Sequence, residues 1–202
     1  MQFAPLVVLA GCVAGVVLRR ADQAASEPVN VDTYPPYNFQ AIPVSGGVPI
    51  INDINEYRQR AKLPLLAWDW HLVNNSYITA ENNVWYHWEK FVHDLQPPSY
   101  AQVMTAGIND AGECGRNMKG WTPFQLSLLC WLCENPSDAA IRANCQQARA
   151  VSGCDPSLSD TEHWQILHSA AYHQIGCAYA HHDVPNSDCS GFNGAWVCDF
   201  SI

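Results

Sequence analysis

The segment EHWQILHSAAYHQIGCA, residues 162–178, decides the fold. Ser159 stands three residues before Glu162, and this S-x-x-E spacing of a capping box predicts that a short helix begins here. The residues that follow predict a strand over 175–180, and a second predicted strand covers 195–200 after several turn residues. The end of the chain is therefore expected to be a short helix followed by a pair of strands.

Three longer helices are predicted upstream of this segment. Apolar residues at helical spacing predict a first helix that ends before Pro64, and Asp69 can cap a second helix. Thr122 and Pro123 provide an N-cap followed by proline at the first helical position, and 135–136 (Asn-Pro) ends that third helix. Helices early in the chain and strands late predict an α+β fold in which helices cover a sheet.

Composition indicates an extracellular, crosslinked protein. The 202 residues carry a formal net charge of −9, and 14% of them are charged, against about 25% in an average domain. A nucleic-acid binder needs a basic face, so this composition argues against nucleic acid as a partner. Nine cysteines together with so little charge are typical of a secreted protein that is held by structural disulfides.

The cysteines are concentrated in the second half of the chain, so packing is expected to hold the first half and disulfides the second. All of them except Cys12 lie beyond Gly112. Without Cys12, eight cysteines remain. This even number allows each one to be paired, and the sequence leaves the connectivity open. The expected disulfide cysteines are Cys114, Cys130, Cys133, Cys145, Cys154, Cys177, Cys189 and Cys198.

The N-terminal region is predicted to be a leader and an arm. The apolar run 3–18 is shorter than the roughly 20 residues of a membrane span, so it favours a signal peptide over the alternative of a membrane anchor. Arg19 and Arg20 end this leader (1–20) as a candidate dibasic processing site. Prolines are frequent in 21–47, which predicts a flexible arm, and the folded domain is expected over 48–202.

Three segments, spread in order over the folded domain, resemble one known family. They are 55–58 with 64–69 and Leu72, then 162–164 with 176–178, and finally 196–200. Together they resemble the CAP superfamily, which comprises cysteine-rich secretory proteins, antigen five and pathogenesis-related proteins, and they point to a fungal pathogenesis-related-like member. The resemblance implies a three-layer α-β-α sandwich that is secreted and stabilised by disulfides.

The resemblance also implies a central cleft with two histidines and two glutamates. Motif positions identify His163 and Glu134, together with Glu113 and His93, and His87 is the alternative to His93. Two imidazoles and two carboxylates suit zinc or a similar divalent ion. Hydrogen bonding that holds the helices in register is an alternative role. Acid–base chemistry in a metal-dependent hydrolase is another, although the resemblance does not imply an established enzyme.

Two binding functions are expected in addition. The third helix is more apolar than one core face requires, and Phe124, Leu128 and Trp131 are candidate contacts for a sterol or fatty acid, which some CAP relatives bind. The alternative is that the whole stripe is core. The acidity, the arm and the aromatic segment 85–88 favour a secreted interaction module with a host extracellular partner, as in an effector. Asn74 begins the sequon Asn-Asn-Ser and is a candidate glycosylation site.

Overall fold

The computed structural model describes residues 44–86, 91–107, 121–142, 144–145, 161–181 and 194–202. Its elements are α1 (Val44–Arg60), β1 (Ala67–Trp68), α2 (Trp70–Tyr86), β2 (Ala101–Gly107), α3 (Pro123–Leu132), α5 (Glu162–Leu167), β3 (Gln174–His181) and β4 (Gly194–Ser201). No helix in these ranges is both long enough and apolar enough to cross a membrane. The predicted leader (1–20) and most of the predicted arm lie outside the described residues.

The strands form one mixed sheet in the order β1-β3-β4-β2. β4 pairs antiparallel with β3 on one side and with β2 on the other, whereas β1 pairs parallel with β3. The two predicted strands are confirmed, and each is one residue longer at both ends than predicted. β1 and β2 were not predicted, because β1 has only two residues and β2 carries polar Gln102 and Thr105 among its apolar residues.

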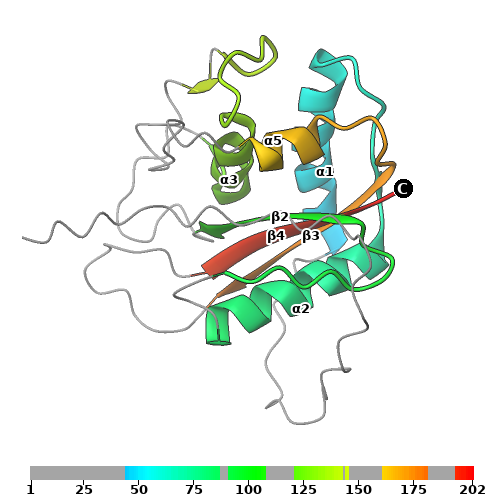
Figure 1. The fold of residues 1–202 in the computed structure, drawn as a ribbon, viewed down its shortest axis with the longest axis vertical. Helices are drawn as coiled ribbons and strands as arrows, with labels where there is room; N and C mark the ends of the chain where they lie inside the picture. Colours follow the sequence, from blue (N-terminus) through cyan, green and yellow to red (C-terminus); the bar gives the residue numbers. More distant parts are fainter. Residues whose placement is uncertain (1–43, 87–90, 108–120, 143, 146–160, 182–193) are drawn as a thin grey trace, which may run out of the picture.

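Helices cover both faces of the sheet. α2 lies along one face, where it packs on β3 and β4, and α1, α3 and α5 lie on the other face (Figure 1). All of β4 is buried, as expected for a strand between two layers. The structure thus confirms the three-layer α-β-α sandwich.

The first turn of α2 lies directly on β3 at Gly176. A Cβ atom at this position would lie 2.2 Å from the backbone nitrogen of Val73 and 2.5 Å from the carbonyl carbon of Leu72. Only glycine permits an approach this close, because it lacks a side chain. The glycine in the segment 162–178 is therefore required by the packing of α2 on the sheet.

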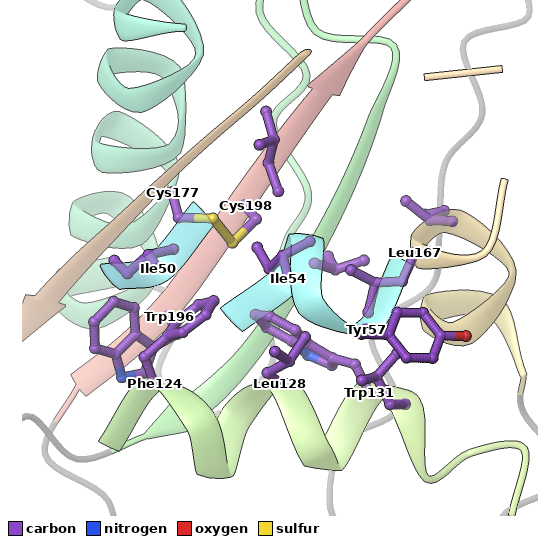
Figure 2. Packing of buried hydrophobic residues seen from close by; sticks show 14 of the residues in the cluster. Ile50, Ile54, Tyr57, Phe124, Leu128, Trp131, Leu167, Cys177, Trp196 and Cys198 are labelled. Atoms are coloured by element: carbon purple, nitrogen blue, oxygen red, sulfur yellow. A yellow bond between two sulfur atoms is a disulfide. The ribbon is translucent and has the colours of Figure 1, made fainter. Parts of the chain in front are cut away.

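The main core fills the space between the sheet and α1, α3 and α5. Figure 2 shows the aromatic residues of α3 packed against Trp196 of β4 and against residues of α1. Phe124, Leu128 and Trp131 have exposed fractions of 4%, 4% and 1%. The structure therefore places these candidate ligand contacts in the packed core, where the alternative interpretation expected them.

Two of the expected disulfides lie within the described residues. Cys177 and Cys198 face each other on β3 and β4 and are bonded across the two strands. Cys133, which caps the end of α3, is bonded to Cys145. Cys130 is also disulfide-bonded. The other three predicted cysteines, Cys114, Cys154 and Cys189, lie outside the described residues.

Helix starts agree with the sequence at two places and differ at two. Asp69 directly precedes α2, and its Oδ1 accepts from the backbone N–H groups of His71 and Leu72, as the predicted cap requires. Thr122 and Gln125 form a reciprocal capping box at the start of α3, as the predicted N-cap requires. The N-cap of α5 is Thr161 rather than Ser159, which lies outside the described residues. The Thr161 hydroxyl accepts from the Gln165 side chain, not from the backbone. α1 begins at Val44, so the last four residues of the predicted arm are helical.

Candidate functional site

One histidine and one glutamate join the end of α3 to the start of α5. Glu134 lies two residues after α3, and His163 is the second residue of α5. The His163 Nδ1 donates to Glu134 Oε1, while Glu134 Oε2 accepts from the backbone N–H of Trp164 at 3.1 Å. The two side chains are 7% and 17% exposed. The structure thus brings together the two residues that the sequence motifs identified as one half of the site.

The second histidine is paired with a residue that the sequence analysis missed. His93 lies in the segment between α2 and β2, and its Nδ1 is 2.9 Å from Oε1 of Gln102 on β2. Burial lowers the pKa of His93 to about 4, the bond to Gln102 opposes this shift, and His163 adds to it by charge repulsion. The two imidazoles therefore lie within electrostatic range of each other, and His93 is neutral at neutral pH.

Gln102 was missed because its strand was missed. A polar residue in a short, half-apolar segment gives no sign of burial until the pairing of β2 with β4 is known, and Gln102 is only 1% exposed. Its buried amide needs partners, but this need becomes visible only once the pairing of β2 with β4 is known. The predicted Glu113 and the alternative His87 both lie outside the described residues.

The far nitrogens of the two imidazoles have the properties of ligand atoms. Nε2 of His93 and Nε2 of His163 are both shielded from solvent and have no hydrogen-bond partner within the part of the chain that the structure describes. A buried polar atom without a partner is costly and indicates an interaction still to be made. Within the same described ranges, no three histidine, cysteine, aspartate or glutamate side chains form a metal-binding group. The donors that the described residues supply are thus two imidazole nitrogens.

The order and spacing of these elements can be compared with known proteins. The model of the family described as "CAP: Cysteine-rich secretory protein family" matches residues 51–200, which is most of the chain. The chain belongs to the CAP family. No curated protein matches this CAP chain significantly.

Two solved structures are similar to this CAP protein. The crystal structure of MpPR-1i soaked with selenourea has 14% identity and a TM-score of 0.44, over 78% of this chain and 91% of that one. The structure of Schistosoma mansoni venom allergen-like protein 4 has 15% identity and a TM-score of 0.45, over 77% of this chain and 86% of that one.

Two further candidates of the CAP domain are the sequon at Asn74 and the aromatic segment 85–88. Asn74 is exposed on α2, whereas Ser76 of the same sequon is buried and bonded to Asp199. An attached glycan at Asn74 would therefore project from the outer face of α2. Trp85 is 37% exposed at the end of α2, and residues 87–88 of the aromatic segment lie outside the described ranges.

Proposed function

We propose that this CAP protein is secreted and that it binds a divalent cation of the zinc type through Nε2 of His93 and Nε2 of His163. The observation that supports the proposal is the pair of buried Nε2 atoms without partners. Metal-bound histidines commonly donate their other ring N–H to a carboxylate or carbonyl oxygen, which fixes the ring and its tautomer. Both histidines have such an oxygen at Nδ1.

The chemistry of the donors suits zinc. Zinc is bound by neutral imidazole nitrogen and by carboxylate oxygen, usually with four ligands. The two histidines would supply two of them, and Glu113 stays the predicted carboxylate ligand. A bound zinc ion supplies Lewis acidity and a more acidic water. The residues of this chain would hold and orient that ion, and Glu134 would fix the ring of His163.

Calorimetric titration of the mature chain with Zn²⁺ tests the proposal. We expect saturable binding by the wild type, and loss of that binding in His93→Ala and in His163→Ala. His71→Ala is the matched control, because His71 is exposed on α2 and should leave the titration unchanged. A wild-type protein that takes up no zinc would reject the function, and so would equal binding by all four proteins.

Binding of a sterol or fatty acid, binding of a host extracellular partner and metal-dependent hydrolysis are further proposals. The apolar character of α3 favours the first, but a ligand that reached Phe124 or Trp131 would have to displace core packing. Native mass spectrometry of the secreted protein would report retained lipid and metal in one measurement. Pull-down from host extracellular fluid tests the partner, and assays of His163→Ala/Glu134→Ala test hydrolysis.

A further inference from the structure

Gln102 and Asp199 form a buried pair across two strands. They are directly opposite each other in the register of β2 and β4, and their exposed fractions are 1% and 0%. Gln102 Nε2 lies 3.1 Å from Asp199 Oδ1 and 3.3 Å from Oδ2. The hydroxyl of Ser76 on α2 also lies 2.7 Å from Oδ2. The Asp199 side chain therefore contacts both Gln102 within the sheet and Ser76 on α2.

Only one orientation of the Gln102 amide satisfies its neighbours. The side of the amide that faces Asp199 also faces the Asp94 carbonyl oxygen at 3.3 Å and Thr79 Oγ1 at 3.1 Å. The Thr79 hydroxyl donates to that same carbonyl at 2.9 Å, so its oxygen accepts from Gln102. An amide oxygen placed there would face acceptors. The NH₂ group must point to this side, and Oε1 must point to His93.

This orientation determines the tautomer of His93. Because Gln102 Oε1 can only accept, the hydrogen of the 2.9 Å bond belongs to Nδ1 of His93. A neutral imidazole has a single N–H, so the lone pair lies on Nε2. His163 also donates from Nδ1, since the carboxylate of Glu134 accepts there.

We propose that Gln102 and Asp199 are positioning residues for His93. The Asp199 carboxylate fixes the Gln102 amide, and the amide holds His93 as the Nδ1–H tautomer with Nε2 free to bind. The proposal rests on the cation-binding function only for the identity of the ligand, because the tautomer exists without metal. It also explains why position 102 carries an amide: a glutamate would place a second buried carboxyl group about as close to Asp199 as the present 3.1 Å contact, and only one of the two could ionise readily.

Long-range ¹H–¹⁵N NMR of histidine-labelled, metal-free protein reads the tautomer directly. We expect the Nδ1–H form for His93 in the wild type. Gln102→Leu removes the acceptor at similar volume, so His93 should shift toward the Nε2–H form and Zn²⁺ affinity should fall about 10- to 100-fold. Gln165→Leu, at an exposed position on α5, is the matched control and should change neither.

Gln102→Met is a second variant that removes the amide and keeps an unbranched side chain. It should shift His93 toward the Nε2–H form as Gln102→Leu does, and it keeps the proposal testable if Gln102→Leu does not fold. An Nε2–H form in the wild type would overturn the inference, and so would a folded Gln102→Leu with unchanged tautomer and zinc affinity. Absence of zinc binding by the wild type would reject the proposed function but leave the tautomer result standing.

Discussion

Glu134 and His163 tie the end of α3 to the first turn of α5, because one carboxylate accepts from the imidazole Nδ1 and from the backbone N–H of Trp164. The same carboxylate therefore closes the start of a helix and orients a candidate metal ligand. Thr161, the N-cap of α5, makes no capping bond with its side chain. Glu134 supplies the acceptor that the helix start would otherwise lack.

Replacing Glu134 with alanine should lower the free energy of unfolding by about 1–3 kcal/mol, because two buried or half-buried donors lose their acceptor. Glu134→Gln keeps an acceptor oxygen and should lose less. Urea unfolding followed by tryptophan fluorescence measures both. Glu56→Ala is the control: Glu56 is 60% exposed and paired with Arg60 on the surface, so its loss should stay within about 0.5 kcal/mol. Equal losses at Glu134 and Glu56 would contradict this role.

Arg58 is a fully buried arginine that holds three backbone segments. Its guanidinium donates to the carbonyl oxygens of Pro64, Leu167 and Ser169 at 2.7, 2.8 and 3.1 Å. Lysine cannot reproduce this planar fork, so Arg58→Lys should cost roughly 2–4 kcal/mol of unfolding free energy. Arg60→Lys, on the exposed side of the same helix, should cost less than about 0.5 kcal/mol. Thermal and urea unfolding of both variants would show whether the costs differ.

Arg58 also shows how far the sequence predicts this structure. The motif at 55–58 pointed to the family, and periodicity and caps predicted the helices, because these signals are local. The contacts of Arg58 join residues separated by as many as 111 positions, and no local pattern reports them.

The same limit applies to the site. His163 and Glu134 were identified from motifs, and the structure pairs them. The pairing of His93 with Gln102 depends on the register of β2 against β4, which is set by packing between strands distant in sequence. A polar residue at an unpredicted strand could not be recognised as a partner. Glu113 was proposed for the site, but it stays a prediction because it lies outside the described residues.

Gly176→Ala should destabilise the fold by about 3 kcal/mol or more, because the added methyl would lie 2.2 Å from Val73 N and 2.7 Å from Asp69 O. These are backbone atoms, so α2 itself would have to move. Ala178→Gly, two residues further along the same strand, removes a methyl and should cost only about 1 kcal/mol. Equilibrium unfolding measures both variants, and a near-neutral Gly176→Ala would show that α2 is free to shift on the sheet.

Asp199 should make the stability of the protein depend on pH. Burial raises the pKa of this carboxyl from its ordinary 3.8 to about 7, hydrogen bonds from Ser76, Ser99 and Gln102 oppose the shift, and the charge of Asp94 adds to it. Between these two values the folded protein binds more protons than the unfolded chain does. The contribution of Asp199 to the unfolding free energy therefore falls as pH rises from about 4 to about 7, in total by a few kcal/mol at most.

Asp199→Asn should remove this slope, because an amide does not titrate, while the Ser76 and Gln102 side chains keep a polar neighbour.

Asp138 is the matched contrast. Burial would raise the pKa of the Asp138 carboxyl, but hydrogen bonds from Tyr57, Ala140 and Trp164 outweigh burial and lower it. Its contribution is therefore lost as pH falls, and Asp138→Asn should reduce stability most above the ordinary pKa of aspartate. Urea unfolding at a series of pH values between about 2.5 and 8 separates the two cases by the sign of the slope, because Asp199 acts between about 4 and 7 and Asp138 acts at about 4 and below. A stability curve for Asp199→Asn that runs parallel to the wild type across this range would show that Asp199 does not titrate there.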